Sequence, residues 1–194
     1  MAHRSSEILF TDSVRKAQIQ YGSREQMERL QQHGQPNDTL TAAERDFIEA
    51  RDGFYLATVS ESGWPYIQFR GGPAGFVRVL DGKTLGYADF RGNRQYVSTG
   101  NLANDDRAAL FFMDYAQRAR LKLLGHARMI DARDAPELIA RLAVPGYPAR
   151  VERAVLITVE SYDWNCHQHI TPRFTEAEFA ALSREPDLHS TGHS

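Results

Sequence analysis

Residues 86–113 read GYADFRGNRQYVSTGNLANDDRAALFFM, and this stretch decides how the chain is expected to fold. A run rich in β-formers at 84–88 leads into a turn with Asn93 and Arg94, and an amphipathic segment then precedes an apolar run at 108–113. The order predicts a strand, a turn, a helix and a second strand. A guanidinium and free backbone amides at a helix start suit a phosphate group. The alternative is a solvated turn that only carries charge.

The chain on both sides of this stretch repeats a period of two, which is typical of strands. Short turn signals such as Gly and Asp-Gly separate these segments. Few helices interrupt them, and strands at short, regular spacing indicate a small, closed antiparallel barrel. The further strands are expected at 54–60, 66–70, 76–80, 120–124, 126–130 and 154–160.

A helical arm is expected before the barrel. Thr11 or Ser13 can cap one helix, and a second helix with Met27 and Leu30 is expected after Gly22-Ser23. Thr41 with Glu44 forms a capping-box pattern at the start of a third. A helix opened by Pro136 is expected between the last strands. The chain therefore divides into an N-terminal helical arm at 1–45, a barrel domain at 46–175 and a C-terminal helix or tail at 176–194.

Composition excludes several classes of protein. The chain has 194 residues, 42% of them hydrophobic, so it can bury the core of one domain. Its formal net charge of -2 argues against nucleic acid as the main partner. No apolar run approaches the about 18–20 residues that a membrane span needs. The start of the chain has no apolar core of a signal peptide, which predicts a cytoplasmic protein without membrane contact.

The single cysteine, Cys166, excludes an internal disulfide and fits a reducing compartment. Cys166, His167 and His169 lie close together, which is one way to begin a metal site. A stable zinc site usually takes two separated pairs of ligands, and no second pair occurs, so no metal is expected. Cys166 beside His167 also resembles an activated thiol, but neighbouring residues of a strand point to opposite faces. The sequence therefore does not support a hydrolase.

Several segments in order resemble the FMN-binding split-barrel family related to pyridoxamine 5'-phosphate oxidase. FYLATVS at 54–60, followed by GWPY at 63–66, looks like the opening hairpin of that family. The turn at Asn93 and Arg94 falls where the family has an Arg-Lys pair that binds the FMN phosphate. The resemblance implies a mainly β, Greek-key type split barrel with peripheral helices and an N-terminal helical arm. It covers about residues 54–170.

The resemblance also implies which residues bind the cofactor. Gln68 stands where relatives often have an arginine, so Arg70 or Arg94 has to supply the positive charge. Arg120 falls on a Gln or Arg of the family, and the segment after the last strand would cover the flavin of the partner subunit. Arg120 is otherwise a solvated cation of the barrel exterior. The complete expected set is Gln68, Phe69, Arg70, Gly71, Ala88, Asp89, Asn93, Arg94, Gln95, Arg120, Trp164, Asn165, Gln168 and His169.

These observations predict a homodimeric, FMN-dependent oxidoreductase that acts on an unidentified small molecule, with a nicotinamide nucleotide as a possible reductant. FMN is expected and not FAD, because no Gly-rich dinucleotide fingerprint follows a strand. The sequence names no catalytic residue, since a flavin would bring the redox chemistry. Two alternatives stay open. Relatives of this barrel also bind haem or a deazaflavin, and others are non-catalytic flavin-binding or stress-related proteins.

Overall fold

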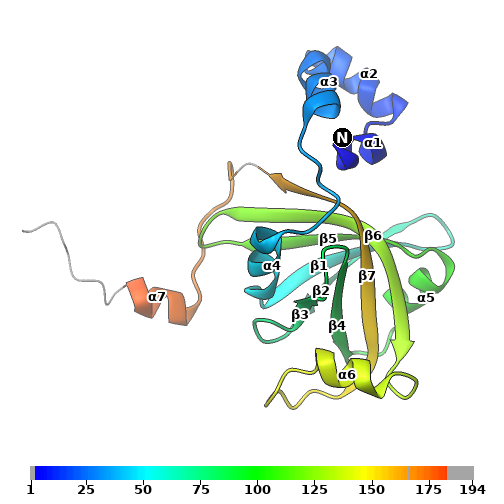
Figure 1. Ribbon diagram of the computed structural model, residues 1–194, viewed down its shortest axis with the longest axis vertical. Helices are drawn as coiled ribbons and strands as arrows, with labels where there is room; N and C mark the ends of the chain where they lie inside the picture. The colour runs from blue at the N-terminus through cyan, green and yellow to red at the C-terminus, as the bar shows by residue number, and fades with distance from the viewer. Residues whose placement is uncertain (1–2, 166, 183–194) are drawn as a thin grey trace, which may run out of the picture.

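The computed structural model describes residues 3–165 and 167–182 and has one seven-stranded antiparallel sheet with helices around it (Figure 1). The strands run in the order β2-β1-β5-β6-β7-β4-β3. They are β1 (Gly53–Val59), β2 (Pro65–Gly71), β3 (Val77–Val79), β4 (Thr84–Phe90), β5 (Arg107–Asp114), β6 (Ala119–Asp131) and β7 (Val151–Asn165). The helices are α1 (Arg4–Leu9), α2 (Asp12–Gln20), α3 (Arg24–His33), α4 (Ala42–Glu49), α5 (Val97–Asn104), α6 (Pro136–Leu142) and α7 (Glu176–Leu182).

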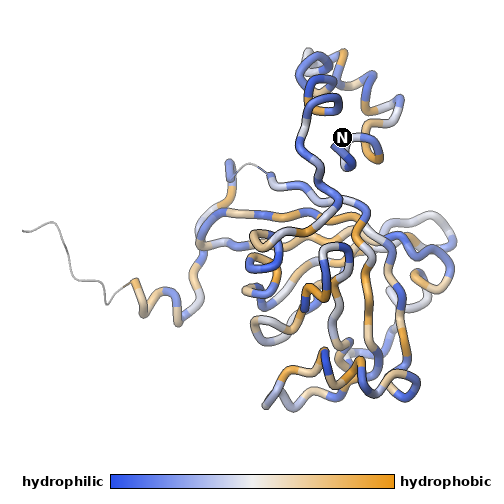
Figure 2. Tube along the Cα trace, viewed as in Figure 1, coloured by the Kyte–Doolittle hydropathy of each residue, from blue (hydrophilic) through white to orange (hydrophobic). Residues whose placement is uncertain are grey.

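The sheet curls around its own apolar face. Phe54 on β1 packs edge-to-face on Tyr87 of β4, with ring centroids 5.4 Å apart, although β1 and β4 are not neighbours in the sheet. Phe76 stacks on the same Phe54 ring at 6.0 Å, and all three rings are buried. In Figure 2 the longest hydrophobic stretches lie in the strands, whereas the arm helices are mostly hydrophilic. The mainly β split barrel is therefore confirmed.

Within the residues that the structure describes, backbone hydrogen bonds do not close the barrel, so the closed barrel expected from strand spacing alone is wrong. Strands β2 and β3 form the two edges of the sheet. β3 has only three residues, since the Gly71-Gly72-Pro73 segment interrupts the alternation before it. Across this opening, the edge strand β2 is linked to β4 by the ion pair of Arg70 with Asp89 instead of by a backbone ladder.

Two strands are longer than the sequence indicated. The segments 120–124 and 126–130 belong to one strand, β6, whose pairing with β7 shifts register between Leu124 and Gly125. A Cβ on Gly125 would lie 2.4 Å from the backbone oxygen of Thr158, so only glycine allows this approach. The glycine marks a bulge within a strand and not its end. β7 also runs well beyond 154–160 at both ends.

The helices begin where their capping residues predict. Thr11 accepts a hydrogen bond from the amide of Val14, and Thr41 and Glu44 form the expected capping box. Pro136 is the first residue of α6. The remaining helix of the arm, α1, was not expected from the sequence, and none of the described helices is long and apolar enough to cross a membrane.

Helix α4 joins the arm to the barrel. Arg45 donates to the backbone oxygen of Val79 at 3.0 Å, and Glu49 accepts from the amide of the same residue at 2.9 Å. Residue 45, the expected end of the arm, lies inside this helix, and α7 begins at residue 176, the expected start of the C-terminal part. The division into three parts itself stays a prediction.

Candidate functional site

The turn between β4 and α5 has an unusual backbone. Arg94 has a φ of 63° and Tyr96 a φ of 54°, both in the left-handed region that residues other than glycine rarely adopt. Asn93 supports the turn, because its side-chain oxygen accepts from the amide of Gln95 at 3.1 Å. Tyr96 is the N-cap of α5 and makes no side-chain capping bond. The amides of the first turn of α5 are therefore left for another acceptor.

Helix α5 is fixed to the barrel behind this turn. Asn101 donates to the hydroxyl of Thr58 on β1 at 3.0 Å, and both residues are buried. Leu102 on the same helix belongs to the main hydrophobic core. These contacts hold the start of α5 against β2, where Ser98 donates to the side-chain oxygen of Gln68 at 3.2 Å.

A small cavity of about 40 Å³ lies at this junction and is the candidate site. It brings together four residues that the sequence pointed to, Gln68, Arg70, Asn93 and Arg94. Its volume suits one phosphate-sized group and is far below the roughly 300–1,000 Å³ of sites that hold whole small molecules. The other lining residues are Phe90, Gly92, Tyr96, Val97, Ser98, Thr99, Glu152 and Arg153.

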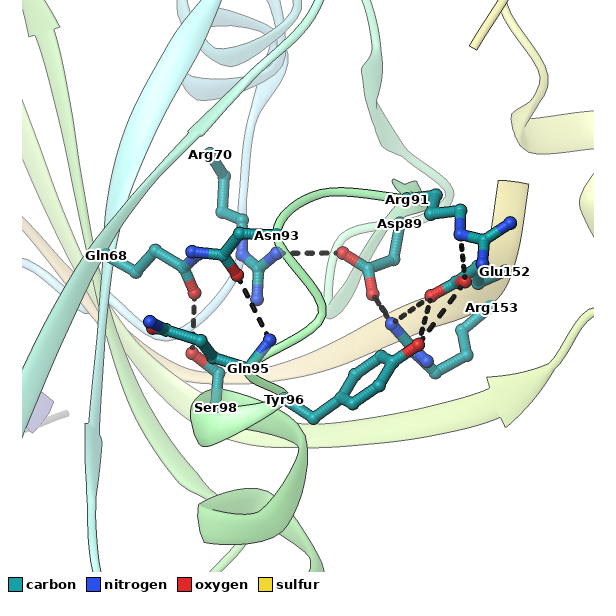
Figure 3. A network of polar contacts seen from close by, with 10 residues as sticks. All are labelled: Gln68, Arg70, Asp89, Arg91, Asn93, Gln95, Tyr96, Ser98, Glu152 and Arg153. Carbon is teal, nitrogen blue, oxygen red and sulfur yellow. Dashed lines mark hydrogen bonds and ion pairs between the residues drawn. The ribbon is translucent and has the colours of Figure 1, made fainter. Parts of the chain in front are cut away.

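A buried carboxylate positions two of the cationic side chains (Figure 3). Asp89 is 2% exposed, and its two oxygens accept separately, one from Arg70 at 2.9 Å and the other from Arg153 at 2.9 and 2.7 Å. Arg153 also stacks over the ring of Tyr96, with its Cζ 5.0 Å from the centroid. Both oxygens of Asp89 already accept hydrogen bonds from these arginines. Asp89 therefore contributes to the cavity by positioning Arg70 and Arg153.

Two cations of the cavity have donors left over. The Nε of Arg70 is buried and has no hydrogen-bond partner among the described residues. The Arg94 side chain is exposed and forms no ion pair with any residue in the ranges that the structure covers. A buried donor without an acceptor is costly, so an anionic ligand in the cavity would improve the site. The cradle therefore fits a phosphate ester.

Phe69 and Ala88 do not line this cavity. Phe69 lies between Gln68 and Arg70 on β2, so its side chain is on the opposite face, where its ring packs 5.5 Å from that of Tyr55. The ring covers Gly71 so closely that a Cβ there would lie 2.8 Å from it. Ala88 is buried in a second core cluster with Leu142 and Ala154.

A second, larger cavity of about 710 Å³ lies on the outer face of the sheet and contains two further expected residues, Arg120 and His169. Its walls are mainly apolar, and the Nε of Arg120 is buried there without a partner in the part of the chain that the structure describes. The walls include Leu9, Tyr55, Ala57, Ile67, Phe111, Met113, Leu124 and Ile170. Arg120 thus lines an apolar cavity and is not a solvated cation of the barrel exterior.

Residues 40–162 match the family model described as pyridoxamine 5'-phosphate oxidase, which is more than half of the chain. The chain belongs to this family. Solved structures share the fold, and no curated protein sequence matches significantly.

Three of these structural relatives have 18–21% sequence identity to this chain. A candidate pyridoxamine 5'-phosphate oxidase from Lactobacillus delbrueckii has a TM-score of 0.50 and 21% identity, over 65% of this chain and 94% of that chain. HupZ from Group A Streptococcus has a TM-score of 0.48 and 18% identity, over 70% and 99% of the two chains. A protein from Clostridium acetobutylicum, related to general stress protein 26, has a TM-score of 0.47 and 19% identity, over 64% and 87%. At these identities the likeness describes the fold alone.

In this member of the pyridoxamine 5'-phosphate oxidase family, Trp164 contacts its own chain. Its indole N–H donates to Glu44 at 2.8 Å, and its ring meets that of Phe47 edge-to-face at 4.7 Å. The indole is still 41% exposed. Asn165 pairs with Arg120 at the end of the β6–β7 ladder, and Gln168 is exposed. Neither these two nor Trp164 lines the phosphate-sized cavity, so their expected contact with a partner's flavin stays a prediction.

The metal alternative depends on a residue that the structure does not describe. Cys166 lies outside the described residues, so its side chain is not placed. Among the residues at 3–165 and 167–182, no group of three His, Asp or Glu side chains could hold a metal ion.

Sequence reasoning missed eight of the lining residues, and four of these take part in the polar contacts of the site: Tyr96, Ser98, Glu152 and Arg153. Tyr96 and Ser98 follow Arg94 so closely that the strand–turn–helix pattern could have included them. Glu152 and Arg153 reach the site only because β7 pairs with β4 in a register that sets Arg153 opposite Asp89. No local pattern in the sequence reveals that register.

Proposed function

We propose that this protein is a homodimeric FMN-dependent oxidoreductase and that the cavity at the start of α5 binds the FMN phosphate. The observation that carries the proposal is the pair of cations with donors left over, Arg70 with its unpartnered buried Nε and Arg94 without an ion pair among the described residues. A phosphate monoester offers three acceptor oxygens and up to two charges. The free amides of α5 favour the same anion.

The flavin ring needs a different place from the phosphate. The cavity of about 40 Å³ has no room for a three-ring system, whereas the cavity of about 710 Å³ has apolar walls and Arg120. Gln68 and Arg70 line the first cavity and Ile67 lines the second, so the two lie on opposite faces of β2. One chain would have difficulty holding the phosphate of an FMN in its smaller cavity and the ring of the same FMN in its larger cavity. In a dimer, one chain could bind the phosphate and the other could bind the ring.

The outer face of the sheet supports a dimer. Tyr55, Ile67 and Phe69 are 36%, 63% and 58% exposed on neighbouring strands β1 and β2. Their cross-strand partners put them on one face, next to Phe111 on β5. An exposed apolar patch of contiguous side chains marks an interaction surface in soluble proteins. A second copy of the chain would cover this patch and bring its own Arg120 and His169 toward the site.

Bound FMN would supply the redox chemistry, which is hydride or electron transfer at the flavin ring. The protein side chains would bind and orient it. Arg70, Arg94 and the α5 amides would fix the phosphate, and the apolar walls of the larger cavity would exclude water from the ring. Arg120, with a free buried donor, is placed to hydrogen-bond an anionic or carbonyl oxygen.

Mass spectrometry of the ligand released from protein purified without added cofactor tests the cofactor assignment. FMN is expected, with a yellow flavin spectrum. FAD, a deazaflavin or a haem Soret band in its place would overturn the assignment. Anaerobic NADH or NADPH should then bleach the flavin bands. Persistent failure of both nucleotides to do so, together with no oxidase activity, would favour a non-catalytic flavin-binding protein.

A further inference from the structure

A carboxylate, Glu152, lines the cavity that is proposed to bind a phosphate. Its side chain is 17% exposed, and its oxygens accept hydrogen bonds from two side chains and form an ion pair with a third. These are the Tyr96 hydroxyl at 3.2 and 3.4 Å, Arg153 Nη2 at 3.2 Å and Arg91 Nε at 3.4 Å. Figure 3 shows the three donors gathered around this one group. A carboxylate beside an anion site repels the anion and lowers the affinity of the site for it. Glu152 is therefore unexpected in a cavity that binds a phosphate.

The two carboxylates of the network are held very differently. Asp89 receives its arginine hydrogen bonds at 2.7–2.9 Å and is 2% exposed. Every contact of Glu152 is 3.2–3.4 Å long, at the outer end of the hydrogen-bond range, and its side chain reaches solvent. Asp89 is therefore the permanent counterion of Arg153, and Glu152 is the exchangeable one.

We propose that Glu152 occupies, in the free protein, donors that a phosphate ester takes over when a ligand binds, and that it thereby sets how strongly the site prefers a phosphorylated ligand. This inference rests on the proposed phosphate site. Tyr96 and Arg153 line the same cavity as Arg94, so an anion there can reach them. A phosphate offers more acceptor oxygens than a carboxylate and suits guanidinium donors well.

Removal of the Glu152 charge should strengthen phosphate binding, whereas a merely structural Glu152 would leave phosphate affinity unchanged. Three arginines and one glutamate line the cavity, so removing the glutamate charge raises its positive potential toward a phosphate. The neutral isostere glutamine keeps a side-chain oxygen that accepts from Tyr96 and Arg153. The Glu152→Gln protein should therefore fold as before and bind the phosphate more tightly.

Isothermal titration of the cofactor-free full chain with FMN and with riboflavin tests this. For Glu152→Gln, FMN affinity should rise about tenfold, because a like charge next to the phosphate is gone, whereas riboflavin affinity should stay within about twofold. Glu137→Gln is the matched control, since Glu137 is an exposed glutamate in the first turn of α6 and lines none of the described cavities. It should change neither affinity.

A second variant tests the transfer of donors. Tyr96→Phe should weaken FMN binding several-fold and leave riboflavin binding unchanged, because the hydroxyl would pass from Glu152 to the phosphate. Weaker or unchanged FMN binding by Glu152→Gln would overturn the inference, and so would an equal gain for FMN and riboflavin. If the native chain binds FMN no better than riboflavin, the proposed phosphate site itself fails, and this inference fails with it.

Discussion

Arg70 on β2 and Asp89 on β4 form an ion pair of 2.9 Å between strands that stand first and sixth in the order of the sheet. Arg153 on β7 completes the link from the other side of the same carboxylate at 2.7 Å. No backbone ladder pairs β2 with β4 or β7 among the described residues, so the two arginines and Asp89 link the edge strand β2 to these two strands instead. The same three residues stand beneath the candidate phosphate site, so closure of the barrel and formation of the site depend on one carboxylate.

Asp89→Asn should therefore destabilise the protein. It leaves Arg70 without an ion-pair partner among the described residues and Arg153 with Glu152 alone at 3.2 Å, at sites where the two arginine side chains are only 16% and 18% exposed. Loss of one partner from a buried charge network costs several kcal/mol, and partial exposure of the arginines reduces this to about 2–4 kcal/mol. Urea denaturation followed by circular dichroism measures the free energy of unfolding.

The matched control for this variant is Asp131→Asn, which removes an aspartate that pairs with the highly exposed Arg133. An ion pair in solvent contributes little, so this variant should unfold at the same urea concentration as the native protein. Equal behaviour of the two variants would show that the Arg70–Asp89–Arg153 link does not hold the barrel together.

Arg94→Ala should weaken FMN binding by about 1.5–3 kcal/mol, the range for hydrogen bonds to charged groups. The fold should be unchanged, because the Arg94 side chain is exposed and forms no ion pair in the described part of the chain. Fluorescence titration of the cofactor-free protein measures the change. Arg29→Ala on α3 is the control, because this arginine forms its one ion pair within the described residues with the exposed Glu25. Unchanged affinity in Arg94→Ala would make Arg70 the main phosphate ligand.

Much of the barrel could be predicted from the sequence, because local rules determine it. Alternation at 54–60, the β-forming residues at 84–88, the Thr41–Glu44 capping box and Pro136 each specify an element through its own residues. The Asn93–Arg94 turn and Gln68 with Arg70 meet because α5 is fixed behind β2. The strand break expected at Gly125 was wrong, since a glycine within a strand also permits a bulge.

The rest of the site depends on register, which no local rule specifies. Arg153 and Asp89 are 64 residues apart and meet through the pairing of β4 with β7. Phe69 is a different case, because strand alternation alone sets it on the face opposite Gln68 and Arg70. The family resemblance had placed Gln68, Phe69 and Arg70 together in the expected cofactor-binding set. Ala88 next to Asp89 is separated from the cavity for the same reason.

The contact between Glu44 and Trp164 should make stability depend on pH. Burial acts to raise the pKa of Glu44, but hydrogen bonds from Thr41 and Trp164 outweigh it and hold the pKa below its ordinary value. A carboxyl with a lowered folded-state pKa stabilises the protein above its unfolded pKa, about 4.3 for glutamate, and this contribution is lost as pH falls through the folded value.

Trp164→Phe should thus cost about 1–2 kcal/mol near pH 7, and the difference from the native protein should shrink below about pH 4. Urea denaturation at a series of pH values measures this. Trp64→Phe, in the exposed turn between β1 and β2, is the control and should be neutral at every pH. A Trp164→Phe difference that does not vary with pH would mean that the indole acts through packing on Phe47 and not through the Glu44 carboxylate.

Ile67→Asp should separate the proposed dimer. Ile67 is 63% exposed on the apolar outer face and also lines the larger cavity, so a charge there would be buried only if a second copy covers it. Light scattering at micromolar concentration should report a monomer. FMN should be lost too, because the cavity that holds the flavin ring would come from the partner. Ile19→Asp, at 66% exposure on α2, is the control and should stay dimeric and yellow. A native chain that is monomeric yet binds one FMN would contradict the shared site, since a single chain would then have to hold both ends of the cofactor.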